Sequence, residues 1–166
     1  DLLGGTAPSV GRVVVTLVLF AGAFVGADLR AVEFYGDTLD LSVGDRFGNF
    51  AFLSFGDHHH DLALQAVPTD DPAPGGRTVG LYHSAWEVPD EAALRATHER
   101  LQSRGVAVTP VDHRISLALY FDDPDGNGVE VYLDTRERND REAWAGENHR
   151  FDPSALAGGD ESDGEN

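Results

Sequence analysis

The sequence predicts an α+β fold built from two βαβββ modules. Each half of the chain reads as a strand, a helix and three further strands, and a stretch rich in Pro, Gly and Asp separates the halves. The chain has 166 residues, of which 41% are hydrophobic, and this is enough to bury a real core. We place the domain at residues 9–135, with modules at about 9–68 and 78–135, after an N-terminal segment at 1–8.

The first module is expected to begin with an apolar strand near Arg12–Leu19. A helix over residues 28–39 follows, because its apolar residues recur at helical spacing. The remaining strands of this module are expected around Leu41–Val43, 49–56 and 59–67. Residues 68–78, PTDDPAPGGRT, have the composition of a linker.

The apolar run at residues 13–27 resembles the hydrophobic part of a signal peptide. It is shorter than the about 20 residues that a membrane-spanning helix needs. We therefore expect a buried strand that runs into a loop of small residues, and a cytoplasmic protein.

The second module repeats the order of the first. A strand over residues 79–88 precedes a helix over 91–104, for which Asp90 is a suitable N-cap and Gly105 a suitable stop. Further strands are expected at 106–111, 117–123 and 129–134, with the tight turn DPDGNG between the last two. Residues 136–166 are polar and acidic, so we expect a C-terminal tail with its last ten residues disordered.

The charge of the chain excludes several classes of partner. There are 29 acidic residues against 12 basic ones, all of them Arg, and the net charge is −17. Such a chain repels nucleic acid and anionic membrane surfaces, so we expect neither as a partner. Acid-rich sequences without Lys are typical of salt-loving microbes. The absence of Cys excludes disulfides and thiolate metal sites.

Three histidines and an aspartate stand side by side in FGDHHHDLAL, residues 55–64. If this stretch is a strand whose leucines pack inward, His59 and Asp61 point the other way, toward a cavity. His60 is then expected to pack or to form a hydrogen bond, and His58 to be solvated.

His83 and Glu130 lie among apolar strand residues, where an unpartnered imidazole or carboxylate is costly. A divalent metal would satisfy both, since neutral imidazole and carboxylate are ligands for iron, manganese and zinc. A single His or Glu in a strand is more often a hydrogen-bonded scaffold residue. Only the combination of these residues on matching strands favours a metal centre.

Several motifs together resemble the vicinal oxygen chelate superfamily, and most of all its small proteins similar to catechol (extradiol) dioxygenases. They are RAVEFYGDTL, FGDHHHDLAL, GLYH and, 47 positions after the His of GLYH, the Glu of DPDGNGVEVY. The resemblance covers about residues 9–135. It implies paired βαβββ modules that form a curved mixed sheet around a central metal, often as a homodimer.

The resemblance implies that His83 and Glu130 are metal ligands. The other family ligand is a His in a GH pair of the first strand, where this chain has Gly11-Arg12, and Arg cannot bind a metal. Related glyoxalases and epimerases take a ligand from the fourth strand of the first module. His59 or Asp61 is therefore the expected replacement.

The resemblance also gives two residues a catalytic role. Tyr120, ten residues before Glu130, has the spacing of the family's active-site Tyr, and His113 is its expected acid–base partner. Relatives usually have Gly where this chain has Arg114, which we expect to meet an anionic substrate.

The sequence thus predicts a metal-dependent extradiol-type dioxygenase, an oxidoreductase acting on a catechol-like small molecule. Fe(II) is the expected metal, with Mn(II) or Zn(II) as alternatives. Two other functions stay open. One is a glyoxalase- or epimerase-type metalloenzyme with a carbonyl substrate, and the other is a metal-free binding or resistance protein that keeps only the cavity.

The net charge leads to a prediction about salt. Self-repulsion should weaken the fold at low ionic strength, because the screening length is about 30 Å at 0.01 M salt and about 3 Å at 1 M. We expect the thermal unfolding midpoint to rise clearly between these two conditions. Calorimetry checks this, and an unchanged midpoint would contradict adaptation to high salt.

Overall fold

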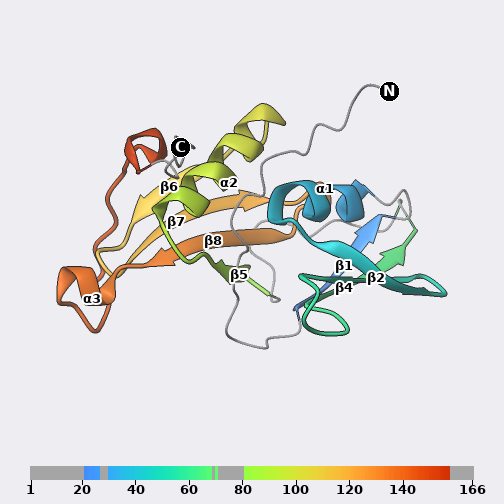
Figure 1. The fold of residues 1–166 in the computed structure, drawn as a ribbon. Coiled ribbons are helices and arrows are strands. Elements are labelled where there is room, and N and C mark those ends of the chain that lie inside the picture. The colour runs from blue at the N-terminus through green and yellow to red at the C-terminus, as the bar shows by residue number, and fades with distance from the viewer. Residues whose placement is uncertain (1–20, 27–29, 69, 71–80, 158–166) are drawn as a thin grey trace, which may run out of the picture.

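Two four-stranded sheets and two long helices make up most of the fold (Figure 1). The structure is a computed structural model that describes residues 21–26, 30–68, 70 and 81–157. The first module consists of β1 (Ala21–Gly26), α1 (Arg30–Leu39), β2 (Ser42–Phe47), β3 (Phe50–Ser54) and β4 (Leu62–Val67). The second consists of β5 (Ser84–Glu87), α2 (Glu91–Ser103), β6 (Thr109–Asp112), β7 (Ser116–Asp122) and β8 (Gly128–Asp134).

The two sheets have the same topology. Their strand orders are β1-β4-β3-β2 and β5-β8-β7-β6. In each sheet the first strand of the module pairs in parallel with the last, and all other pairs are antiparallel. The predicted α+β class and the βαβββ order of both modules are confirmed.

The helices cover one face of the sheets because their apolar residues follow helical periodicity. In α1 these include Phe34, Tyr35 and Leu39, and α2 buries Leu94 and Leu101 completely. The predicted ends of α2 are confirmed. Asp90 accepts a hydrogen bond from the Ala93 amide at 2.8 Å, and Gly105 has a φ of 70°, a conformation that Gly adopts at little cost.

The two modules meet through buried contacts between α1 and the β7–β8 turn. The Tyr35 hydroxyl, in a residue that is only 1% exposed, donates a hydrogen bond to Asp123 Oδ2 at 3.0 Å. Beside it the rings of Phe34 and Phe121 lie 6.0 Å apart. Burial, and then the negative charge of Asp123, raises the pKa of Tyr35, so its hydroxyl stays protonated and remains a donor.

Asp123 also organises the turn that it begins. Its Oδ1 accepts hydrogen bonds from the backbone amides of Asp125 and Asn127, and its Oδ2 accepts one from the Asn127 side chain. A buried carboxylate with this many donors is well satisfied. The same side chain therefore shapes the β7–β8 turn and ties it to the first module.

Several predicted strand boundaries are wrong. The strand expected at 59–67 begins only at Leu62, because the Asp61 carboxylate bonds to Ser54 Oγ and to the Phe55 amide and so closes a loop before the strand. The strand expected at 79–88 begins at Ser84, so His83 immediately precedes β5. The strand expected at 106–111 begins only at Thr109. The first strand of the fold lies at Ala21–Gly26, where the sequence predicted a loop of small residues, because this stretch pairs in parallel with β4. The strand expected at Arg12–Leu19, the segment 1–8 and most of the linker lie outside the described residues.

Residues 136–157, which the sequence places in an acidic tail, fold back onto the second module. We call them the C-terminal strap. The strap holds α3 (Arg136–Asn139), a backbone bridge between His149 and Asp112, and the short helix η1 (Pro153–Ala155) against α2. Figure 1 shows it wrapping one end of the second module. Residues 158–166 lie outside the described part of the chain.

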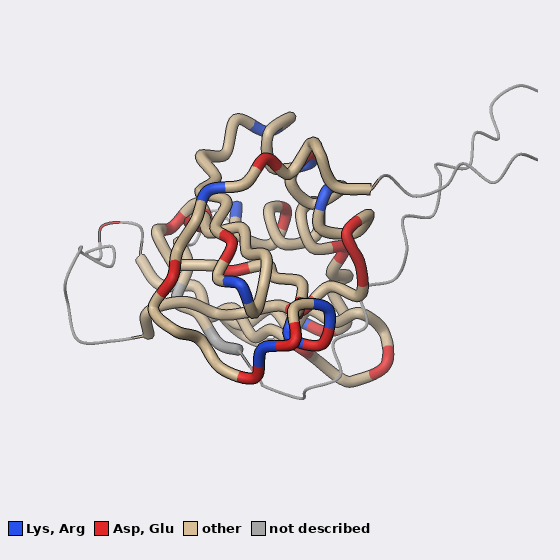
Figure 2. Tube along the Cα trace, turned by 90° about the vertical axis from the view of Figure 1, so that its left-hand side faces the viewer, with Lys and Arg blue, Asp and Glu red and all other residues tan. Residues whose placement is uncertain are grey.

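Two further features concern the surface. Acidic positions are spread around the described trace, with arginines interspersed among them (Figure 2). No helix in the described ranges is long and apolar enough to span a bilayer.

Replacement of Tyr35 by Phe tests the contact between the modules. Loss of a buried hydrogen bond to a carboxylate should lower the free energy of unfolding by about 1–3 kcal/mol, measured by urea denaturation in high salt. The matched control is Tyr132→Phe, since the Tyr132 hydroxyl bonds to Glu87 in an exposed pair. Equal stability of Tyr35→Phe and wild type would contradict this role.

Candidate functional site

A cavity of about 710 Å³ lies against the second sheet, on the face turned away from α2. Strand alternation explains this placement, because Leu119, Val129 and Val131 are buried in the core while Tyr120 and Glu130 point to the opposite face. The lining side chains come from β6, β7, β8, the segment before β5 and the strap. They are Tyr82, Thr109, Val111, His113, Ile115, Ser116, Tyr120, Glu130, Trp144 and Asn148.

Glu130 is the most buried ionisable group in this cavity, with 8% of its surface exposed. Its Oε2 lies 2.8 Å from His83 Nε2, and its Oε1 accepts a hydrogen bond from the Tyr120 hydroxyl at 2.7 Å. A buried carboxylate is costly unless both oxygens find partners. Here the strand register supplies both partners. Tyr120 lies directly opposite Glu130 on β7. On the other side, Ala85 of β5 pairs with Glu130, and His83 stands two residues before Ala85.

Tyr120 connects Glu130 to His113. The His113 Nε2 lies 2.9 Å from the Tyr120 hydroxyl oxygen, and its Nδ1 lies 2.7 Å from Asn148 Oδ1. Burial raises the pKa of Tyr120, and the hydrogen bond to Glu130 and its charge raise it further. Tyr120 therefore keeps its proton at neutral pH. The four side chains form a continuous hydrogen-bonded series from the strap to the sheet.

A tight turn between β6 and β7 presents His113. Arg114 in this turn has a φ of 67°, a left-handed conformation that favours Gly, and its amide bonds to Asp112 Oδ1. The Arg114 side chain pairs with Asp112 at 3.4 Å and with Glu147 at 3.8 Å. It is absent from the cavity lining, so the structure places the candidate substrate residue in contact with the strap.

Gly128 allows the segment before β5 to lie close to β8. A Cβ atom at this position would stand 2.5 Å from the Tyr82 carbonyl oxygen and 3.3 Å from His83 Cβ. Because real Cβ atoms do not approach backbone so closely, any larger residue would displace the segment that carries His83. The position of His83 next to Glu130 depends on this glycine.

The histidine-rich stretch lies elsewhere. His58 to Asp61 are in the loop between β3 and β4, where His59 is near Asp45 and its Nδ1 lies 2.8 Å from His60 Nδ1. The Asp61 carboxylate is engaged by Ser54 and Phe55. The structure therefore brings together His83, Glu130, Tyr120 and His113, but it does not bring His59 or Asp61 to them.

The donor atoms of His83 and Glu130 fit a divalent metal as two neighbouring ligands. Bonds of about 2.1 Å at right angles put two ligand atoms about 3 Å apart, close to the 2.8 Å between Nε2 and Oε2. Among the described residues no group of three or more His, Asp or Glu side chains could hold a metal ion. The sequence of β1, AGAFVG, contains none of these residue types.

Trp144 and Asn148 are residues of the site that the sequence did not indicate. Both come from the strap, whose polar composition is typical of a tail. The only signal was Trp144 itself, one of two Trp in the chain, standing in an otherwise polar segment. Large aromatic residues seldom occur in such segments unless they contact something.

The comparison with protein-family models decides the family. The model described as "Glyoxalase/Bleomycin resistance protein/Dioxygenase superfamily" matches residues 17–131. The chain belongs to this superfamily. The match includes His83, His113, Tyr120 and Glu130, and it ends before the strap.

Two curated relatives are dioxygenases by name. Catechol-2,3-dioxygenase of Bacillus subtilis (strain 168) is 35% identical over 105 residues, which are 63% of this chain and 37% of the relative. Biphenyl-2,3-diol 1,2-dioxygenase 2 of Rhodococcus globerulus is 31% identical over 103 residues, 61% of this chain and 54% of the relative. The chain thus matches only about a third to a half of these relatives' length.

Solved structures confirm the fold. A glyoxalase/dioxygenase from Nostoc punctiforme has a TM-score of 0.57 at 21% identity, covering 81% of this chain and 99% of its own. The fosfomycin resistance protein FosX from Mesorhizobium loti has a TM-score of 0.56 at 18% identity, covering 75% and 98%. At these identities the likeness concerns the fold alone.

Replacement of Gly128 by Ala should displace His83 from Glu130. We expect a loss of about 1–3 kcal/mol in the free energy of unfolding and shifted imidazole resonances of His83 in NMR spectra. Gly105→Ala is the matched control, because its Cβ meets no atom but its φ of 70° is strained. It should cost about 1 kcal/mol and leave the His83 resonances in place. Unshifted His83 resonances in Gly128→Ala would contradict the close approach.

Proposed function

We propose that this protein is a metal-dependent, ring-cleaving dioxygenase of the extradiol type that acts on a catechol-like small molecule. The observation that carries the proposal is the hydrogen-bonded series from His113 through Tyr120 to Glu130, on the wall of a cavity of about 710 Å³. A cavity of this size suits a small molecule. The names of the two curated dioxygenases above support the same reaction class.

His83 Nε2 and Glu130 Oε2 would hold the metal, with Fe(II) as our first choice and Mn(II) or Zn(II) as alternatives. When bound, the ion would act as a Lewis acid that lowers the pKa of a catechol hydroxyl and brings dioxygen beside the ring. We keep His59 and Asp61 as proposed sources of a third ligand. Their loop lies apart from His83 in this structure. In a homodimer, the same loop of the partner's first module could supply the third ligand instead.

His113 and Tyr120 would handle protons and orient the substrate. The 2.9 Å contact between His113 Nε2 and the Tyr120 hydroxyl oxygen would hold the imidazole at the cavity wall, where it could exchange a proton with a bound substrate. Tyr120 keeps its own proton and donates it to Glu130 Oε1, so its hydroxyl oxygen accepts a hydrogen bond from His113 Nε2. Asn148 is a positioning residue, because its amide offers both an acceptor and a donor and holds the His113 ring whether or not Nδ1 carries a proton.

One observation favours a second candidate, a metal-free binding or resistance protein of the same superfamily. The strand β1 contains no His, Asp or Glu, and among the described residues only two ligands meet. Such a protein would keep the cavity and bind a small molecule without turning it over. A glyoxalase- or epimerase-type enzyme differs from both, since it would convert a carbonyl substrate without oxygen.

Oxygen uptake tests the proposal. Protein loaded with Fe(II), kept reduced and in high salt, should consume oxygen with a panel of catechols. His113→Ala and Tyr120→Phe should lower turnover by about 10²–10⁴-fold, the usual contribution of general acid–base catalysis, while metal content stays nearly intact.

Two control variants match these substitutions in chemistry. His58→Ala removes an exposed loop histidine and Tyr132→Phe removes a hydroxyl bonded to Glu87, so both should keep wild-type turnover. The dioxygenase proposal fails if the loaded wild type consumes no oxygen with any catechol. Binding without turnover would then favour the metal-free candidate, and anaerobic turnover of a carbonyl substrate would favour the glyoxalase type.

A further inference from the structure

The strap contributes an aromatic wall to the cavity. Trp144 lines the cavity and is 54% exposed, and its indole N–H donates a hydrogen bond to the Glu147 carbonyl at 2.9 Å. Its ring stands at 89° to that of His113, with centroids 6.1 Å apart. The indole is therefore fixed in orientation beside the proposed acid–base histidine.

The strap that carries Trp144 is anchored on both sides. Before Trp144, Arg138 pairs with Glu91 at the start of α2, and Asn139 bonds to the Arg114 carbonyl oxygen. After it, His149 forms a two-way backbone bridge with Asp112, and the Ala157 amide bonds to Glu91 Oε2 at 3.2 Å. The hydrogen bond from Arg138, and then that from Ala157, lowers the pKa of Glu91, so its anchoring charge persists at neutral pH.

Two exposed aromatic side chains line this cavity. Among the described residues, five large hydrophobic side chains are exposed, and two of them, Tyr82 at 85% and Trp144 at 54%, line the cavity. Fixed, exposed aromatic side chains in a concave site indicate a ligand with an apolar, flat portion.

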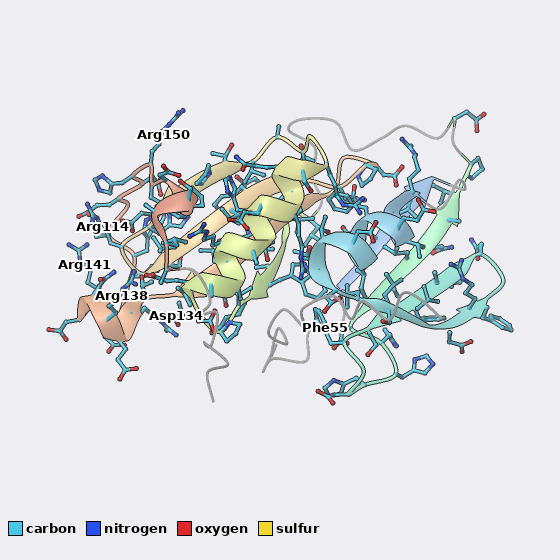
Figure 3. The ribbon with its side chains drawn as sticks, turned by 45° about the horizontal axis from the view of Figure 1, so that its top comes forward. Phe55, Arg114, Asp134, Arg138, Arg141 and Arg150 are labelled. Carbon is cyan, nitrogen blue, oxygen red and sulfur yellow. The ribbon has the colours of Figure 1, made fainter. Side chains whose placement is uncertain are left out.

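The charge around the cavity indicates that the ligand is uncharged. No Arg lines the cavity, although several lie nearby at the same end of the module (Figure 3). Arg114 and Arg141 both pair with Glu147, and Arg138 pairs with Glu91. Arg150 points outward in Figure 3. A substrate carboxylate would thus find no Arg on the cavity wall away from the proposed metal ligands.

We propose that the strap is the substrate-recognition wall of this site, on which Trp144 packs against the aromatic ring of an uncharged catechol. This inference rests on the proposed function, from which it takes the identity of the ligand as a catechol. The strap, residues 136–157, lies beyond residues 17–131, the part of the chain that matches the superfamily model.

Ligand affinity measures the contribution of Trp144. Titration calorimetry would follow binding of catechol and of 3,4-dihydroxybenzoate to the full chain, in high salt and without oxygen. Trp144→Ala should weaken catechol binding by about tenfold, and Trp144→Phe, which keeps an aromatic face, should recover most of it. Phe47→Ala is the matched control, because Phe47 is 77% exposed at the β2–β3 turn and does not line the cavity.

A second measurement needs no variant. The chain has two Trp, and Trp86 is only 5% exposed, so acrylamide quenching of tryptophan fluorescence reports mainly on Trp144. Saturation with catechol should clearly reduce this quenching. Unchanged quenching would overturn the proposal even if Trp144→Ala did not fold.

The remaining outcomes separate this inference from the proposed function. Equal catechol affinity of Trp144→Ala and wild type, tighter binding of 3,4-dihydroxybenzoate, or no binding of catechol would each overturn the recognition wall. Oxygen uptake that is indifferent to Trp144 would keep the dioxygenase and remove the wall. Trp144-dependent binding of catechol without oxygen uptake would keep the wall and remove the dioxygenase.

Discussion

The geometry of the site follows from the burial of a single carboxylate. Glu130 stands in the middle of the second sheet between Val129 and Val131, where a charge without partners would be very costly. Its two oxygens are satisfied by His83, which immediately precedes β5, and by Tyr120 on β7. The series then extends to His113 and the strap. A buried carboxylate needs hydrogen-bond partners, and the partners of Glu130 also fix its position as a functional group would require.

The rest of the fold holds these strands in place. The β7–β8 turn that sets the register of Tyr120 and Glu130 is built on Asp123, and Asp123 is held by Tyr35 of the first module. At the other end, Gly128 lets the chain before β5 approach β8 closely enough to deliver His83. The first module therefore supports the site through its helix, although its own strands bring no side chain to the series.

Much of this arrangement was predictable from the sequence. Helical periodicity, the cap at Asp90 and the stop at Gly105 defined α2, and alternation along β7 and β8 put Tyr120 and Glu130 on one face. The position of Asp61 could not be predicted from strand alternation. Its carboxylate accepts hydrogen bonds from Ser54 and Phe55, so the neighbouring histidines lie in a loop and not in the strand.

The ordered structure of the strap could not be predicted from the sequence for a related reason. Its contacts are ion pairs and backbone bonds between residues far apart in the chain, such as Glu91 with Arg138 and Asp112 with His149, and these leave no periodic pattern in the sequence. A polar composition is therefore compatible with an ordered segment when long-range charge pairs and a few buried residues, such as Pro153, hold the segment against the rest of the domain.

The central claim is that the carboxylate of Glu130 marks a metal centre. Anomalous X-ray diffraction from crystals of the Fe(II)-loaded protein tests this most directly, because it locates the ion without reference to activity. The account predicts iron within bonding distance of His83 Nε2 and Glu130 Oε2. Iron bound only at the loop of His58, His59 and His60, or no iron at His83 and Glu130, would contradict it.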